Sequence, residues 1–385
     1  MRWIILFVLF FARTTMAFQF QSIAALSPYM VENLALTLAD IGLLIGLYLG
    51  PGVIVATLGG TLATWIGDKR TVFASIVLMV LGGIAVAMAP TLGWAITGRV
   101  ISGAGGVVIN VIMTKMVIDW FEGKYTSTAL AIFISSWPVG IALCLLSLPA
   151  LASLGGLSLA WNALITLTVV ALILFAVLYR SPPGVTKPAA TKIHLTSLPW
   201  TPLIYAAGLW GLFNAAIAMV FGFGTLILVE RGLSTTAASA TASVFLLAIA
   251  AAAPAGGWIA DRTGRQNMNI AISCIAGIVM FPAILYAPVS TLGVLFCAGG
   301  ILFGLAPGPI VSMPGKILSA EARTFGTGIY YSLYYAVMMI APPFAGILAD
   351  YAGGATVTFV FGSVLSALSL AMLALYQRSV KTLPG

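Results

Sequence analysis

The sequence predicts an all-α integral membrane protein with twelve transmembrane helices in two six-helix bundles related by pseudo-two-fold symmetry. Two observations lead to this class. The 385 residues are 61% hydrophobic and only 7% charged, whereas soluble domains carry about a quarter charged residues. A polar stretch near the middle of the chain also separates two sets of long apolar segments. So much apolar surface excludes a single water-soluble core, and the hydrocarbon of a bilayer must be the solvent.

The apolar segments are long enough to cross a bilayer, which takes about twenty helical residues each. The first set covers 3–31, 38–64, 72–90, 93–117, 126–150 and 160–180, and the second covers 202–228, 236–259, 268–288, 292–315, 324–349 and 355–377. The polar segment between them is rich in proline and turn residues. We therefore predict an N-terminal bundle over 1–180, a cytoplasmic linker over 181–200 and a C-terminal bundle over 201–385.

The start of the chain admits a second interpretation. Arg2, an apolar run and Thr15-Met16-Ala17 resemble a signal peptide. However, the apolar stretch continues to about Met30, and the seventh segment needs a counterpart in the first half. A transmembrane helix is therefore the favoured interpretation.

The basic residues set the expected orientation. With both termini in the cytoplasm, the cations at helix ends lie on the cytoplasmic side except Arg231, as the positive-inside rule requires. They are scattered singly, which argues against a nucleic-acid partner. The three cysteines show no paired spacing, so no disulfide or metal site is predicted. We expect a monomeric, multi-pass protein of a bacterial inner membrane without a cofactor.

The two halves contain repeated segments. Gly60–Arg70 and Gly257–Arg265 each place one carboxylate beside cations between apolar stretches, and Thr91-Leu92-Gly93 has its counterpart in Thr291-Leu292-Gly293. Internal repeats of this kind are typical of secondary transporters, which bind their solute near the midplane between the halves.

The second repeat resembles the signature loop of the major facilitator superfamily, Gly-x-x-x-Asp-Arg-x-Gly-Arg. The matching residues are Gly257, Asp261, Arg262, Gly264 and Arg265. The first repeat lacks the second glycine and has additional residues before its aspartate. The resemblance implies alternating access by rocking of the two bundles.

Two further resemblances concern the N-terminal half. Arg99 with the following glycines resembles the fourth-helix motif of the same superfamily. Arg13 and Asp119-Trp120-Phe121 resemble the cyanate and nitrate/nitrite porter branches, although the glycine- and asparagine-rich nitrate signatures are not evident.

The repeated loops predict a cytoplasmic gate. Their charges can pair across the bundles, stabilise an outward-open state and separate on inward opening. The alternative is ordinary topological charge with a tight turn at Gly264. The expected gating residues are Asp68, Lys69, Arg70, Asp261, Arg262 and Arg265.

Two arginines, and no carboxylate, fall well inside predicted spans. A pathway with Arg13 and Arg99 and no fixed counter-charge should attract anions, because a guanidinium matches carboxylate and oxyanion geometry. Arg99 shares a helix face with Gly103, Gly106 and Asn110; the alternative is that it binds backbone carbonyls beside glycines that allow close packing. The same structural alternative applies to Arg13. The expected solute-binding residues are Arg13, Gln19, Gln21, Arg99, Asn110, Trp137, Asn214, Tyr334 and Tyr335.

Three local features modify individual spans. Pro138 interrupts the fifth span, and the preceding serines are expected to satisfy the backbone groups that it frees. Glycines and prolines around Pro307 make the tenth span breakable. Lys115 lies near the cytoplasmic interface, and we expect its side chain to extend toward it.

These features predict a facilitative or secondary active transporter for a small organic or inorganic anion, with proton coupling left open. The alternative is a proton-coupled drug efflux pump, which usually carries Gly-Pro-x-x-Gly-Gly in the fifth helix, where this chain has Trp137-Pro138-Val139-Gly140-Ile141-Ala142. A receptor or scaffold on the same fold is a third possibility. No nucleophile–base constellation, phosphate-binding loop or metal cluster predicts an enzyme.

Overall fold

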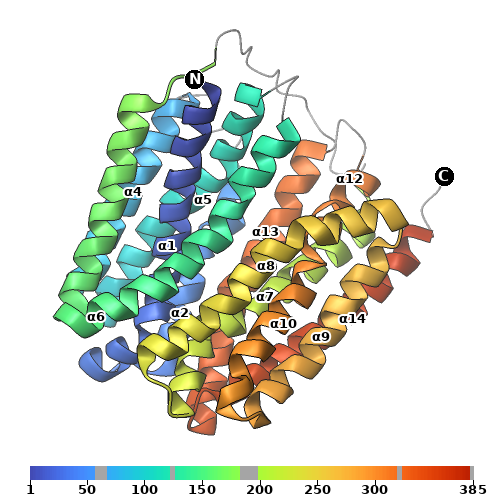
Figure 1. Cartoon of the computed structure of the whole chain (residues 1–385). Coiled ribbons are helices and arrows are strands. Elements are labelled where there is room, and N and C mark those ends of the chain that lie inside the picture. The colour runs from blue at the N-terminus through green and yellow to red at the C-terminus, as the bar shows by residue number, and fades with distance from the viewer. Residues whose placement is uncertain (57–66, 122–125, 183–197, 319–322, 382–385) are drawn as a thin grey trace.

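The computed structural model describes residues 1–56, 67–121, 126–182, 198–318 and 323–381, and these residues form helices joined by short connections (Figure 1). Within the described ranges no residue lies in a β-strand. The side chain of Asp261 lies outside the described part, as does most of the predicted linker, from 183 to 197. The exact domain boundaries therefore stay a prediction.

The N-terminal bundle contains helices α1 to α6. Their bounds are Arg2–Leu34 for α1, Leu38–Leu49 for α2, Asp68–Ala87 for α4, Leu92–Phe121 for α5 and Thr126–Leu178 for α6. The part of the second predicted span after Ala56 lies outside the described residues.

Helix α6 is two membrane spans in one continuous assignment. Its 53 residues exceed what a bilayer requires, and the backbone leaves helical geometry at Gly155 and at Gly156, where φ is 71°. A residue with a Cβ rarely adopts that positive φ. The glycine pair therefore produces the break between the predicted fifth and sixth spans.

The C-terminal bundle contains helices α7 to α14. Their bounds are Trp200–Glu230 for α7, Thr235–Thr263 for α8, Gln266–Tyr286 for α9, Val289–Thr291 for the 3₁₀ helix η2, Leu292–Gly304 for α10, Pro307–Val311 for α11, Met313–Ile317 for α12, Arg323–Ala352 for α13 and Thr356–Lys381 for α14. The predicted tenth span is thus interrupted between Gly304 and Pro307, because proline has no N–H to continue the helical ladder.

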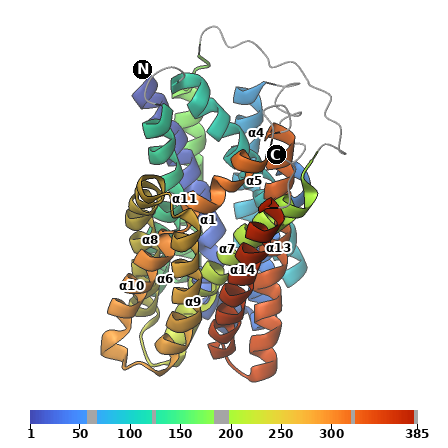
Figure 2. The same ribbon diagram turned by 90° about the vertical axis from the view of Figure 1, so that its right-hand side faces the viewer.

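Eleven described helices are long and apolar enough to cross a membrane, and the break in α6 gives the twelfth span. The described ends of the chain lie at the same end of the molecule (Figure 2). The predicted twelve-helix, two-bundle, all-α membrane fold is confirmed.

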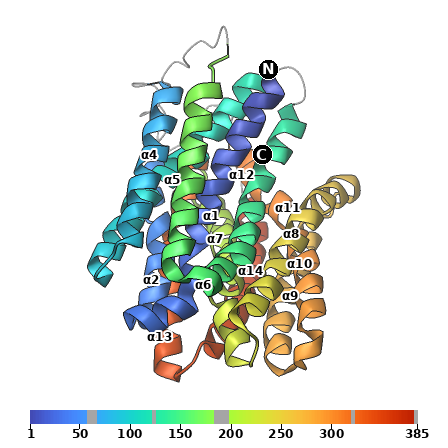
Figure 3. The same ribbon diagram turned by 60° about the vertical axis from the view of Figure 1, so that its left-hand side comes forward.

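The bundles meet most closely at the end opposite the termini, where α2 packs on α13 (Figure 3). Gly42 and Gly46 of α2 lie so near the carbonyl oxygens of Pro342 and Met339 that a Cβ at either position would collide with the α13 backbone. The first turn of α2 also donates two hydrogen bonds across the interface, from the N–H groups of residues 38 and 39 to the carboxylate of Asp350, both at 2.8 Å. This packing holds the two bundles together at the end opposite the termini, which we call the outer end.

Candidate functional site

Arg13 lies in the middle of α1 and is 9% exposed. Its Nε donates to Oδ1 of Asn110 on α5 at 3.0 Å, and its Nη1 donates to the carbonyls of Phe133 and Ile134 on α6 at 2.9 and 3.0 Å. Nη1 also lies 3.3 Å from Oγ of Ser136. The guanidinium stacks over the Phe133 ring at 4.8 Å. It therefore joins three helices of the N-terminal bundle.

One of the α6 acceptors is available because of Pro138. Proline has no N–H, so the carbonyl four residues earlier, that of Ile134, loses its helical partner. Arg13 donates to that carbonyl and to the preceding one. Ser136 donates to the same Phe133 carbonyl at 2.5 Å. The predicted compensation by serine is thus made by Ser136 together with Arg13.

Asn110 extends this site across the bundle interface. Its Nδ2 donates to the hydroxyl of Tyr335 on α13 at 3.1 Å. Next to Tyr335 lies Tyr334, with ring centroids 5.0 Å apart, and Tyr334 stacks on Trp210 of α7 at 5.8 Å. A guanidinium and an amide of one bundle therefore face aromatic side chains of the other.

Arg13 retains hydrogen-bonding capacity. Among the described residues, its Nη2 has no hydrogen-bond partner and its guanidinium forms no ion pair. Tyr331, Tyr334 and Tyr335 are close enough to interact with its charge. A buried cation without a counter-ion is costly, and among the described residues only uncharged acceptors compensate this guanidinium.

Arg99 occupies a different environment. It is 1% exposed, and its Nε, Nη1 and Nη2 donate to the carbonyls of Leu44, Gln19 and Phe20 at 2.8, 2.9 and 2.9 Å. Its guanidinium also stacks over the Tyr48 ring at 4.5 Å. All three nitrogens bind the backbone of α1 and α2, which is the structural alternative that the sequence left open.

Of the other predicted solute-binding residues, one contacts the opposite bundle and three contact their own bundle. Gln19 donates to the Met79 carbonyl at 2.8 Å inside the N-terminal bundle. Gln21 donates across the interface to the Phe221 carbonyl at 2.5 Å.

Trp137 packs on Phe20 at 5.2 Å, and Asn214 donates to the carbonyl of Trp210 in its own helix at 2.8 Å. The structure thus brings together Arg13, Asn110 and Tyr335 by hydrogen bonds and joins Tyr334 to them by ring contact. It does not place Gln19 beside Arg13 in any described contact.

The first predicted gating loop is held within the N-terminal bundle. Asp68 pairs with Lys115 of α5 at 2.5 Å, and Lys115 also pairs with Asp119 at 3.1 Å. Lys69 donates to the carbonyl of Tyr179 at 2.8 Å, while Arg70 is exposed. These contacts join α4, α5 and the end of α6, and none of them crosses to the other bundle. Burial raises the pKa of the Tyr179 hydroxyl, which therefore stays neutral.

The second predicted gating loop contains the tight turn that the alternative interpretation of this loop named. Gly264 follows α8 in the left-handed region, with φ of 66°, which is where a helix C-cap favours glycine. Arg262 stacks over Trp258 at 5.1 Å, and Arg265 is exposed. The cytoplasmic gating role of both loops stays a prediction.

Sequence reasoning missed two members of this arrangement. Trp210 looks like an ordinary interfacial aromatic in the sequence, but its Nε1 is buried without a hydrogen-bond partner in the described structure. Lys115, predicted to extend toward the interface, also binds two carboxylates, which the sequence analysis did not foresee. The spacing of Lys115 and Asp119 at i, i+4 was the available signal for the second pair. Among the described residues no His, Cys, Asp and Glu cluster could hold a metal ion.

Comparisons with known proteins agree with this architecture. The family model described as Major Facilitator Superfamily matches residues 3–313 and 225–384. An uncharacterized 38 kDa protein from Thermoproteus tenax is 25% identical over 349 residues, covering 86% of this chain and 85% of the relative. The lysosomal dipeptide transporter MFSD1 of Danio rerio is 23% identical over 393 residues, covering 93% and 83%.

Solved structures show the same fold. A bacterial homologue of the human lysosomal transporter Spinster, in an inward-facing and unoccupied conformation, aligns with a TM-score of 0.81 at 15% identity, covering 98% of this chain and 97% of the other. A point mutant of the nucleoside transporter NupG aligns with a TM-score of 0.78 at 15% identity, covering 97% and 99%. These matches do not confirm the cyanate or nitrate/nitrite branch. The family match spans both bundles, and the chain belongs to the major facilitator superfamily of membrane transporters.

Proposed function

We propose that this transporter carries a small solute bearing a carboxylate or another oxyanion, with Arg13 as the anion-binding residue. The observation that carries the proposal is the free Nη2 of Arg13, on a buried guanidinium that has no ion-pair partner among the described residues. A bidentate or charge-assisted hydrogen bond from this group suits an oxyanion.

Arg99 has a framework role in this proposal. Its three nitrogens already bind backbone carbonyls, so a solute would have to displace buried hydrogen bonds to reach it. We therefore expect Arg99 to hold α1, α2 and α5 together. Asn110, Tyr334 and Tyr335 then complete the solute site around Arg13.

The similarity to a dipeptide transporter suggests which solutes to test first. A short peptide ends in a carboxylate that Arg13 can bind, and its remaining groups would face the uncharged aromatic side chains of α7 and α13. The closed packing of α2 on α13 supports a cycle in which the solute reaches Arg13 from the cytoplasmic end in this state. The loop charges around Asp68 and Asp261 would pair across the bundles when that end closes.

The test is uptake into proteoliposomes, with a panel of dipeptides, monocarboxylates, dicarboxylates and inorganic oxyanions, and with lipophilic cations as the contrast set. We expect uptake of one anionic class, and a loss of at least about tenfold in Arg13→Gln when equal amounts of folded protein are compared, since a lost charge-assisted hydrogen bond contributes roughly that much. Arg13→Lys keeps the charge and should retain part of the uptake.

Two results would contradict the proposal. Full uptake by Arg13→Gln would remove the anion-binding role of this residue. Uptake of lipophilic cations with no anionic solute would favour drug efflux, the alternative function. Repeating the panel with a pH gradient decides whether protons drive the uptake.

A further inference from the structure

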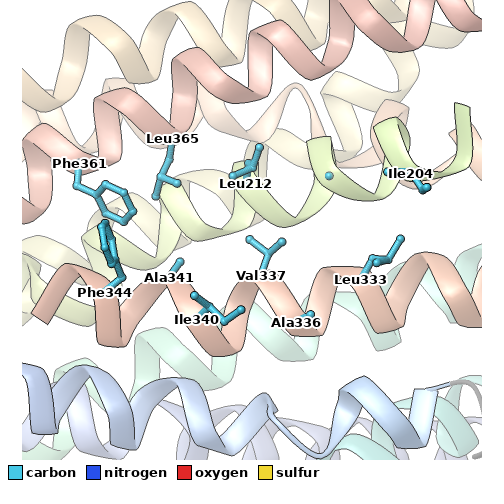
Figure 4. Close-up of a pocket in the computed structure, with 11 residues that line it drawn as sticks. Ile204, Leu212, Leu333, Ala336, Val337, Ile340, Ala341, Phe344, Phe361 and Leu365 are labelled. Atoms are coloured by element: carbon cyan, nitrogen blue, oxygen red, sulfur yellow. The ribbon is translucent and has the colours of Figure 1, made fainter. Parts of the chain in front are cut away.

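One side of α7 faces the N-terminal bundle. The Phe221 ring contacts the Phe20 ring of α1, with ring centroids 5.6 Å apart. At about 100° per residue, Trp210 and Asn214 lie within about 20° of Phe221 around the helix. Leu212 lies about 180° away, where it lines an apolar groove between α7, α13 and α14 (Figure 4). Trp210 and Asn214 are therefore on the side of α7 that faces the other bundle.

Asn214 and Arg13 lie at about the same depth in the molecule. Six spans separate the start of α1 from the start of α7, so the two helices run in the same direction. Asn214 precedes Phe221, and Arg13 precedes Phe20, by the same number of residues, which is about 10 Å of helix in each case. The contact between the two rings therefore brings both polar side chains to one level, and Trp210 lies one turn nearer to the end with the termini.

Trp210 and Asn214 both have free hydrogen-bonding groups. The indole N–H of Trp210 can only donate, and its Nε1 is buried without a partner among the described residues. Asn214 uses its Nδ2 for the Trp210 carbonyl at 2.8 Å, and its Oδ1 has no hydrogen-bond partner in the described structure. Because an unpaired buried donor is unfavourable, a solute acceptor at Trp210 would be preferred to a methylene group. This face of α7 thus presents one donor and one acceptor, one helical turn apart.

The charges around this layer decide which solute group fits the pair. Every Asp and Glu side chain that the structure describes lies within two residues of a helix end. None of these carboxylates is therefore at the depth of Arg13. A solute ammonium group would lose its hydration there without gaining a counter-ion, whereas an uncharged amide would gain both a donor and an acceptor. The pair accordingly suits an amide of a solute that has no free amine.

We infer that Trp210 and Asn214 form the second half of the solute site and bind an uncharged amide group of the solute. The Trp210 N–H donates to the amide carbonyl, and Oδ1 of Asn214 accepts from the amide N–H. An amide fits better than a single hydroxyl, because its donor and acceptor are separate atoms that point in opposite directions, toward two side chains one turn apart. The inference rests on the proposed binding of the carboxylate by Arg13. It assigns N-acyl amino acids as the solute class.

Three solutes of nearly identical shape test this assignment. N-acetylglycine has the amide, 4-oxopentanoate replaces its N–H by a methylene group, and pentanoate also lacks the carbonyl. Dissociation constants of the purified protein are measured for each solute. We expect the affinity to fall about fivefold or more at each step, since each step removes one hydrogen bond. Glycylglycine, which adds an ammonium group to N-acetylglycine, should also bind about fivefold or more weakly.

Two substitutions assign each step to one residue. Asn214→Leu should abolish the difference in affinity between N-acetylglycine and 4-oxopentanoate, because the acceptor of the amide N–H is removed. Trp210→Phe should abolish the difference between 4-oxopentanoate and pentanoate, because the donor to the carbonyl is removed. Asn162→Leu and Trp94→Phe, at exposed positions of the N-terminal bundle, are the matched controls and should keep both differences.

The possible results separate this inference from the role of Arg13. Equal affinity for the three solutes in the wild type, with a loss in Arg13→Gln, would overturn the roles of Trp210 and Asn214 and leave that of Arg13 intact. Binding of none of the three, while another anion binds in an Arg13-dependent way, would have the same meaning. Glycylglycine that binds as tightly as N-acetylglycine would overturn the exclusion of a free amine. Affinities that Arg13→Gln leaves unchanged would instead contradict the anion-binding role of Arg13.

Discussion

Asp350→Asn is expected to weaken the closed outer end of the transporter. The Asp350 carboxylate accepts two hydrogen bonds at 2.8 Å from the first turn of α2, and these bonds join α13 of one bundle to α2 of the other. Asparagine keeps one acceptor oxygen and loses the charge. Because the residue is exposed, we assign about 1 kcal/mol to the lost hydrogen bond and about 0.5 kcal/mol to the lost charge at a helix N-terminus.

The sum of about 1.5 kcal/mol corresponds to roughly a tenfold change in an equilibrium constant. The ratio of outer-closed to outer-open molecules should therefore fall about tenfold. Spin labels replacing Glu32 and Tyr351, both exposed near the outer ends of α1 and α13, measure this ratio as a distance distribution. Asp350→Asn should increase the population at the longer distance.

Asp40→Asn is the matched control for this measurement. This substitution removes the same charge from the same end of the protein, but the Asp40 carboxylate caps α2 through Thr37 within one bundle. It should change the stability of α2 and leave the distance distribution nearly unchanged. Identical distributions in both variants and the wild type would refute the role assigned to Asp350.

Three further predictions concern the N-terminal bundle. Arg99→Gln should lower the melting temperature strongly, since it removes three buried charge-assisted hydrogen bonds that join α5 to α1 and α2, at roughly 1–3 kcal/mol each; an unchanged melting temperature with lost uptake would return Arg99 to the solute site. Gly103→Ala should also destabilise the fold, because a Cβ there would collide with the α2 backbone, whereas Gly93→Ala meets no atom within 4 Å and should be neutral in the same thermal-shift assay. Pro138→Ala restores a helical donor for the Ile134 carbonyl, which then competes with Arg13 for this acceptor. Because Arg13 is held less firmly, solute affinity in a binding assay should fall while the protein stays folded. Unchanged or tighter binding would contradict the link between this proline and Arg13.

Periodicity and composition predicted most of the fold, because every membrane span must form its backbone hydrogen bonds internally where lipid surrounds it. The sequence predicts a break between the fifth and sixth spans, and the structure places a non-helical turn there, at Gly155 and Gly156. The interruption near Pro307 also follows from the glycines and prolines around it. These features are local, so one segment of sequence contains the information.

The arginine environments could not be predicted in the same way. Arg13 and Arg99 both lie inside apolar helices, and only tertiary packing distinguishes a guanidinium bound entirely to carbonyls from one with a free nitrogen. One acceptor of Arg13 is the Ile134 carbonyl freed by Pro138, on a helix that lies far from α1 in the chain. The ion pair of Lys115 with Asp68 could not be predicted either, because it forms only where α4 lies beside α5.

The uneven distribution of charge between the bundles has a consequence for the energy of the transport cycle. Arg13 and Asn110 belong to the N-terminal bundle, whereas α7 and α13 contribute uncharged aromatic side chains to the same layer. A solute held by Arg13 would therefore travel with one bundle while the other slides past it. At the depth of Arg13, the change between the two open states would then separate no opposite charges in a medium of low dielectric constant, which keeps this electrostatic part of the barrier small.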